Sequence, residues 1–281
     1  MQLQSLPGQY LQADSKYAQI LSNLSEQAIP NHRAIAFFLL MRGNCLLRLH
    51  QYNRVIQYDD QARGLINQSI DPHLFASIND QEAAACEGQF SVNHDARLIK
   101  KASLLRETSI SIYDAQKDYA PGALDQFRTL ACDYSFLKQQ DKAIPLFRRT
   151  IQLYASTHQG RTAQCAWTIQ SLADLFGGMQ RWDEALKEYQ DALPVYQSTT
   201  ADPLVIQRVR YDCAYCLLRL KHPEKAETIL QLVLAEKCND LPLRQLEIQS
   251  MFEALSAQNK MEQAKQMEKQ LQSINERLKK S

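Results

Sequence analysis

Apolar residues recur at helical spacing along most of the chain. The segment from Trp167 to Phe176 shows this clearly, with apolar residues at positions 169, 172, 173 and 176. A polar turn that contains two glycines follows at 177–181 and ends the segment. A second segment begins at Trp182 and has Asp183 and Glu184 in its first turn, where acidic side chains interact favourably with the helix dipole. The pattern predicts two amphipathic helices joined by a short turn.

The same pair of segments recurs along the sequence. Residues that break helices fall at Pro30, Pro72, Pro121, Gly160, Pro203 and Pro242. The intervals between them are 42, 49, 39, 43 and 39 residues, and all but the second contain two amphipathic segments around a polar turn. A period of about 40 residues built from helix pairs is typical of a solenoid, in which each pair buries its apolar face on the next. The predicted fold is all-α, a right-handed α-solenoid of about six helix-turn-helix repeats with capping helices at both ends.

This period predicts one continuous solenoid domain with regular internal boundaries. We expect an N-terminal capping helix at 1–29, repeat 1 at 30–71, a degenerate repeat 2 at 72–120, repeat 3 at 121–159, repeat 4 at 160–202, repeat 5 at 203–241, and a C-terminal repeat with a capping helix at 242–281. A solenoid has a continuous core, so its length does not translate into a number of globular domains.

Both ends of the chain carry amphipathic segments suited to capping. The N-terminal segment has apolar residues at Tyr10, Tyr17, Leu21, Leu24 and Ala28. The C-terminal segment has them at Ala264, Met267, Leu271, Ile274 and Leu278. The second set follows heptad spacing, which also allows a homodimer through the C-terminal helix. We prefer a cap because a solenoid needs terminal helices with a polar outer face to stay soluble.

Composition narrows the function classes. The chain has 32 basic and 31 acidic residues, and this near-neutral charge disfavours a dedicated nucleic-acid binder, which needs a basic excess. Eight glycines and nine prolines are few for an all-β fold, which needs turn residues in every hairpin. The 45% hydrophobic content supports a folded core. These values agree with a folded helical protein.

The sequence also predicts a cytoplasmic protein. Residues 1–7 have neither the basic nor the apolar stretch of a secretion signal. The longest apolar run, residues 34–41, is much shorter than the roughly 20 residues that a membrane-spanning helix needs. The seven cysteines are an odd number without the spacing of a disulfide framework, as expected for free thiols in a reducing compartment.

Motifs for catalysis, metal binding or cofactor binding are missing from the sequence. It contains no glycine-rich phosphate loop, no His-Glu-x-x-His and no Gly-x-Ser-x-Gly. Asp59 and Asp60 are neighbours on a predicted helix, point about 100° apart, and are expected to be exposed to solvent. Cys213 and Cys216 lack the further ligands of a zinc site and are expected to pack as small apolar side chains. We therefore predict no catalytic residue, no metal and no cofactor.

The fourth repeat resembles a known family. Its residues Leu172-Ala173-x-x-Phe176, then Trp182-Asp183-Glu184-Ala185-x-x-x-Tyr189-x-x-Ala192, are similar to a tetratricopeptide repeat. Repeats 3 and 5 follow the same register, with Ala143 and Ala226 at the position of Ala185, and repeat 1 has Val55 there. Repeat 2 matches weakly because Glu87 and Lys100 stand where apolar residues are expected, and its equivalent position is predicted at Ala96. The long period resembles the long-helix variety found in kinesin light chains, bacterial pheromone receptors and the soluble attachment proteins of vesicle fusion.

The resemblance implies a concave wall built from the first helix of each repeat. The family's groove positions correspond here to Asn44 and Arg48 in repeat 1, Arg128 and Thr129 in repeat 3, Trp167, Gln170 and Asp174 in repeat 4, and Arg208, Tyr211, Asp212, Tyr215 and Arg219 in repeat 5. Arginine and aromatic side chains are common at protein interfaces because they combine contact area with directional hydrogen bonds.

The leading interpretation is a non-catalytic adaptor or scaffold that binds a segment of a partner protein in this groove. Four arginines among the groove positions favour a partner with some acidic character. Two alternatives stay open: a regulatory receptor that senses a short peptide, and an enzyme or accessory subunit of a larger complex. An enzyme would need a pocket with convergent titratable groups.

Overall fold

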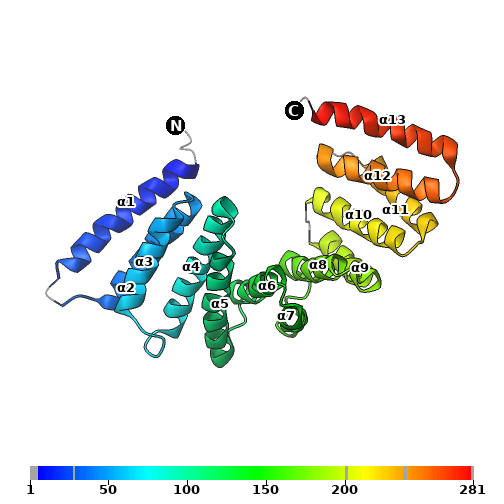
Figure 1. Cartoon of the computed structure of the whole chain (residues 1–281). Coiled ribbons are helices and arrows are strands. Elements are labelled where there is room, and N and C mark those ends of the chain that lie inside the picture. Colours follow the sequence, from blue (N-terminus) through cyan, green and yellow to red (C-terminus); the bar gives the residue numbers. More distant parts are fainter. Residues whose placement is uncertain (1–5, 28, 200–201, 237–238, 280–281) are drawn as a thin grey trace. The chain divides into compact units, whose positions relative to one another are not determined.

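The computed structural model describes residues 6–27, 29–199, 202–236 and 239–279. Over these residues the chain folds into helices alone, with no strand, so the all-α prediction is confirmed (Figure 1). The described helices are α1 (Leu6–Ser25), α2 (His32–Arg48), α3 (Tyr52–Leu65), α4 (Pro72–Asn93), α5 (Ala96–Gln116), α6 (Pro121–Phe136), α7 (Gln140–Ser156), α8 (Ala163–Gly178), α9 (Trp182–Ser198), α10 (Pro203–Arg219), α11 (Pro223–Ala235), α12 (Leu241–Ala257) and α13 (Met261–Leu278).

The helices form two compact units, residues 1–146 and residues 147–281, with the border inside α7. In the first unit, α2 packs against α3 and α4 against α5; in the second, α8 packs against α9, α10 against α11, and α12 against α13. First helices of neighbouring pairs also touch, α2 with α4 and α10 with α12. This sequential packing of helix pairs is the arrangement of a helical repeat protein. The expected single domain and its internal boundaries stay predictions.

Every turn inside a pair has the same conformation. Its last residue but one has a positive φ between 56° and 61°, and the residue is His50, His94, Lys138, Gln180, Lys221 or Asn259. In most of these turns the next backbone N–H returns to a carbonyl five residues back, as from Arg181 to Phe176. This hydrogen bond satisfies a carbonyl that the end of the helix leaves open. The turn therefore ends the first helix, and the second helix begins two residues after the positive-φ residue in each described pair.

A buried residue lies five positions after the positive-φ residue of each described turn. It is the fourth residue of the second helix and is almost inaccessible in all six pairs: Val55, Ile99, Ala143, Ala185, Ala226 and Ala264. The intervals between these positions are 44, 44, 42, 41 and 38 residues. Small or β-branched side chains at this point allow the two helices of a pair to approach closely.

The register predicted for the second pair is wrong by nearly one turn of helix. Ala96 begins α5 and is exposed, whereas Ile99 is buried at the equivalent position. The preceding residues account for the shift, because His94 takes the left-handed turn conformation and the side chain of Asp95 caps α5 by accepting from the backbone N–H of Arg97. The sequence pattern predicted an alanine at the buried position of this pair, and the structure has the larger Ile99 there.

The N-terminal helix covers the first pair, as predicted. Leu21 is buried in a cluster with residues of α2, α3 and α4, including Ala36, Leu39 and Leu74. The guanidinium of Arg42 on α2 also donates a 2.7 Å hydrogen bond from Nε to the Asp14 carboxylate on α1. Ala28, expected to belong to this cap, lies outside the described residues.

The C-terminal helix packs its apolar stripe on α12. Ala264 is buried in the core cluster of the second unit, and Met267 packs against the same cluster. Ile274 is buried further along the helix. This stripe therefore already has a partner within the chain, which favours the capping role; a homodimer through α13 stays a prediction.

Asp59 departs from its predicted environment. It was expected to be exposed like Asp60, but its side chain is completely buried on α3 and neither carboxylate oxygen has a hydrogen-bond partner. Burial, with a smaller contribution from the Glu82 carboxylate, raises its pKa to about 8. The helical period explains the difference, because Asp59 lies four residues after buried Val55 and three before buried Ala62, on the inner face of α3.

Asp59→Asn should make stability less dependent on pH. The raised pKa means that folded Asp59 keeps its proton between about pH 4 and pH 8 while the unfolded chain has released it, so stability falls as pH rises. The variant should remove about 1 kcal/mol per pH unit from the slope of the unfolding free energy between pH 5 and 7. Chemical denaturation at several pH values measures this slope. Asp60→Asn is the matched control, and an equal change in both variants would contradict the explanation.

Gln180→Gly should stabilise the fold by about 1 kcal/mol, because a non-glycine residue pays roughly that much for the left-handed conformation. Gln180 has a φ of 59° and its side chain is exposed, so little packing is lost. Gln180→Ala keeps a Cβ at the same position and should leave the free energy of unfolding within a few tenths of a kcal/mol. Equal stability of the glycine and alanine variants in denaturant titrations would rule out this strain.

Candidate functional site

Two cavities follow the same pair of helices in the second unit. The first, of about 620 Å³, is lined by the N-terminal halves of α8 and α10, with one residue of α9 and the start of α12. The second, of about 270 Å³, is lined by the C-terminal halves of α8 and α10 and by α9. We call the two cavities together the α8–α10 groove. They lie one turn apart, because Gln170 and Arg208 line the first, and Asp174 and Asp212 line the second.

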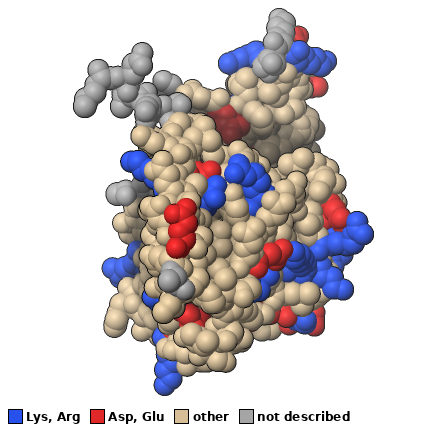
Figure 2. Space-filling model, turned by 90° about the vertical axis from the view of Figure 1, so that its left-hand side faces the viewer, with Lys and Arg blue, Asp and Glu red and all other residues tan. Residues whose placement is uncertain are grey.

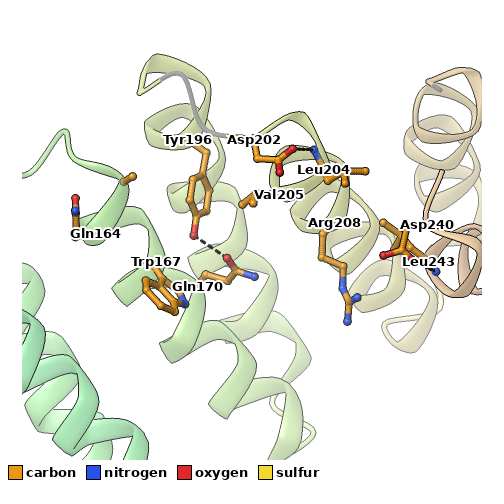
Figure 3. Close-up of a pocket in the computed structure, with 11 residues that line it drawn as sticks. Gln164, Trp167, Gln170, Tyr196, Asp202, Leu204, Val205, Arg208, Asp240 and Leu243 are labelled. Atoms are coloured by element: carbon orange, nitrogen blue, oxygen red, sulfur yellow. Dashed lines mark hydrogen bonds between the residues drawn. The ribbon is translucent and has the colours of Figure 1, made fainter. Parts of the chain in front are cut away.

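Helix α9 supplies the floor of the groove through two buried tyrosines. The hydroxyl of Tyr196 donates a 2.8 Å hydrogen bond to Oε1 of Gln170, which Figure 3 shows in the first cavity. The hydroxyl of Tyr189 donates a 2.5 Å hydrogen bond to Oδ1 of Asp174 in the second cavity. Both rings are buried, so they fill the space behind α8 while their polar ends reach the groove. These bonds fix the orientation of two side chains on its wall.

The first cavity combines apolar surface with a few polar groups. Trp167 on α8 and Leu204 on α10 are 52% and 39% exposed, so both present apolar surface to the cavity. Asp202 and Asp240 cap the next helices by accepting from the backbone N–H of Leu204 and Leu243. In Figure 3, Trp167 and Tyr196 lie on one side of the cavity and Arg208 and Leu243 on the other. This chemistry suits an apolar side chain flanked by polar backbone.

The second cavity combines two carboxylates with aromatic rings. Asp174 from α8 and Asp212 from α10 both line it. The rings of Trp182 and Tyr215 meet edge to face, with centroids 5.8 Å apart. The nearest described cation is Arg208, whose Nε lies 3.6 Å from Oδ1 of Asp212. The cavity is therefore acidic and aromatic.

The pKa values of the two carboxyl groups reflect this crowding. Burial, together with the Asp174 charge, raises the pKa of Asp212 to about 7, although Arg208 opposes the shift. Burial also raises the pKa of Asp174, against the hydrogen bond from Tyr189. Two carboxylates with one nearby guanidinium are incompletely neutralised.

Half of the predicted groove residues line the two cavities. These are Trp167, Gln170 and Arg208 in the first cavity, and Asp174, Asp212 and Tyr215 in the second. The prediction for the first helices of repeats 4 and 5 thus selected residues that the fold brings to one groove, while their role in binding stays a prediction.

The other predicted residues are placed differently. Tyr211 was expected on the open wall but is buried in the core against α12, with its hydroxyl 3.5 Å from Ser250 Oγ. Arg219 contacts the carboxylate of Glu253 and the ring of Tyr215. In the first unit, Arg128 is buried beside Asp125 and Thr129 is half-buried. Asn44 and Arg48 are exposed on α2.

Several groove residues lie outside the predicted set. Tyr189 and Tyr196 belong to a second helix, and Leu243 belongs to the following repeat. The family pattern gives Tyr189 a packing role and does not reveal that its hydroxyl reaches the groove. The position of Trp182 could have indicated a groove residue from sequence alone. It directly follows a turn, and a large aromatic side chain there can extend back toward the end of the first helix.

Three of the four arginines predicted for the groove lie beside carboxylates. Arg128 pairs with Asp125, Arg208 with Asp212, and Arg219 with Glu253. The face in Figure 2 shows basic and acidic side chains interspersed across the surface. The reason given for an acidic partner is therefore weakened by carboxylates that the sequence pattern did not place beside these arginines.

The described residues offer no metal-binding cluster and no helix suited to crossing a membrane. Cys213 and Cys216 are buried, as expected, and burial raises the pKa of both thiols to about 12. Both side chains are therefore protonated thiols at neutral pH, which are poor nucleophiles.

Comparisons with known proteins agree with this architecture. The model of the tetratricopeptide repeat family matches residues 127–198, which contain α7, α8 and α9. No curated protein sequence matches the chain.

Three solved structures illustrate the similarity of fold. The apo form of RapI has a TM-score of 0.73 and 12% identity, over 96% of this chain and 72% of that one. BtubC from P. vanneervenii has a TM-score of 0.67 and 13% identity, over 82% of this chain and 90% of that one. YrrB, described as a TPR protein with an unusual peptide-binding site, has a TM-score of 0.55 and 16% identity, over 85% and 98%. Residues 127–198 thus match the tetratricopeptide repeat family, and the chain has the fold of tetratricopeptide-type helical repeat arrays.

Proposed function

We propose that this chain is a non-catalytic interaction module that binds an extended segment of another protein in the α8–α10 groove. The observation that carries the proposal is the succession of two cavities along α8 and α10, from their N-terminal to their C-terminal halves. A chain lying along two helices would place successive side chains in the two cavities. This is peptide recognition by a groove between helices.

The exposed apolar residues support a peptide as ligand. Trp167 and Leu204 would gain from burial under a side chain of the partner, since covering apolar surface is the main favourable term in association. The oriented amide of Gln170 and the carboxylates nearby would bind backbone or polar groups of the peptide. YrrB, which shares the fold, is described as having a peptide-binding site.

The partner's charge and location follow from the same residues. The α8–α10 groove holds four aspartates, Asp174, Asp202, Asp212 and Asp240, against one arginine, Arg208. A partner segment with basic rather than acidic character fits this balance better. The described cysteines are free, and this supports a reducing compartment such as the cytoplasm.

Trp167→Ala and Leu204→Ala should each weaken peptide binding by about tenfold or more, as expected for loss of a central apolar contact. Random peptides displayed on phage and selected on the whole chain supply the probe, and fluorescence anisotropy of a synthesised selected peptide gives its Kd. Both substitutions truncate side chains that are already exposed, so the fold is expected to persist.

Leu232→Ala is the matched control, since Leu232 on α11 is 60% exposed and lines neither cavity. Its Kd should equal that of the unmodified chain. Peptides whose affinity is unchanged by Trp167→Ala and Leu204→Ala, or the enrichment of no peptide at all, would overturn the proposal.

A further inference from the structure

The second cavity holds more negative charge than its surroundings neutralise. Asp174 and Asp212 line it from different helices, and the closest described cation, Arg208, is itself half-exposed and lines the first cavity. Burial opposes the ionised form of both carboxyl groups, and the Asp174 charge adds to the rise in the pKa of Asp212. A cation placed between the two carboxylates would relieve the repulsion.

The aromatic residues of this cavity also favour a cation. Trp182 and Tyr215 are half-buried, so parts of both rings are open to the cavity. The guanidinium of Arg219, which does not line the cavity, already makes a cation–π contact with Tyr215, 4.9 Å from the ring centroid. Cations bind to the faces of tryptophan and tyrosine through the ring quadrupole, more strongly where water is partly excluded.

Packing of the helices does not require two carboxylates, Asp174 and Asp212, in this cavity. The hydrogen bond from Tyr189 uses one oxygen of Asp174, and Arg208 approaches one oxygen of Asp212. Neutral side chains of the same size would pack there without the cost of burying charge. A binding role gives a reason for carboxylates in a half-enclosed cavity.

We propose that the second cavity binds the guanidinium group of an arginine residue in the partner peptide, between Asp174 and Asp212 and against Trp182 and Tyr215. This deepens and rests on the proposed peptide-binding function. A guanidinium fits better than an ammonium group because its planar array of N–H donors can contact two carboxylates and stack on a ring at a lower desolvation cost.

The two tryptophans of the chain make the proposal directly measurable. Trp167 lines the first cavity and Trp182 the second. In protein labelled with 5-fluorotryptophan, each gives its own fluorine NMR signal, and Trp167→Phe assigns them. N-acetylarginine amide should shift the Trp182 signal, and N-acetylcitrulline amide, a neutral analogue of similar shape, should bind at least about tenfold more weakly.

Asp212→Asn should abolish most of the shift that N-acetylarginine amide causes. The substitution keeps the shape of the side chain and removes a carboxylate that is costly to bury, so the fold should be retained, which circular dichroism checks. Asp191→Asn is the matched control, because Asp191 is exposed on α9 and lines neither cavity. Equal shifts with the arginine and citrulline compounds, or an unchanged response in Asp212→Asn, would overturn the proposal.

Different results would refute the arginine site and the peptide-binding function. Selected peptides that need Trp167 and Leu204, but bind Asp212→Asn as tightly as the unmodified chain, would refute the arginine site and leave peptide binding intact. A Trp182 shift with N-acetylarginine amide, in a chain that selects no peptide, would support the arginine site and refute the extended groove.

Discussion

The close approach of two helices beside a buried residue is the contact on which the whole structure depends. In each described pair, a residue in the left-handed conformation follows the first helix, and the residue five positions later, on the second helix, is buried. Because the number of residues between the turn and this buried position is constant, the second helix of every described pair starts at the same point relative to the first. Changes in total repeat length, from 38 to 44 residues, are taken up elsewhere. The array tolerates an isoleucine or a valine at this position as well as alanine.

The groove arises where this regular packing leaves space. First helices of neighbouring pairs touch in α10 and α12, but between α8 and α10 two cavities open, floored by α9. The tyrosines of α9 fill the space behind the wall and direct their hydroxyls at polar groups of α8. Large aromatic side chains on a second helix therefore contribute to the surface that the first helices present, because each ring is long enough to cross from one helix layer to the other.

Buried carboxylates distinguish this chain from a purely apolar repeat array. Asp59 in the first unit and Asp212 in the second have raised pKa values for the same main reason, the loss of water around the charge. Their surroundings differ in function. Asp59 is closed off from solvent, so its protonation acts on folding stability alone, whereas Asp212 faces a cavity where an arriving cation can stabilise the ionised form. The same chemistry affects stability at Asp59 and, in the proposed arginine site, would affect cation binding at Asp212.

The sequence by itself determined the helices, their pairing and the faces that meet, because these depend on local periodicity and on turn residues close in the chain. It identified the buried alanines of the later repeats and six residues that line the groove. It misplaced the register at Ala96, where a large buried residue replaced the expected small one, and it assigned Asp59 to solvent on residue type alone. Only the tertiary structure decided which arginines meet carboxylates, that Tyr211 turns into the core, and that Tyr189 reaches Asp174. These contacts join residues on different helices, and a repeat pattern fixes which helix faces meet without fixing which long side chains touch across them.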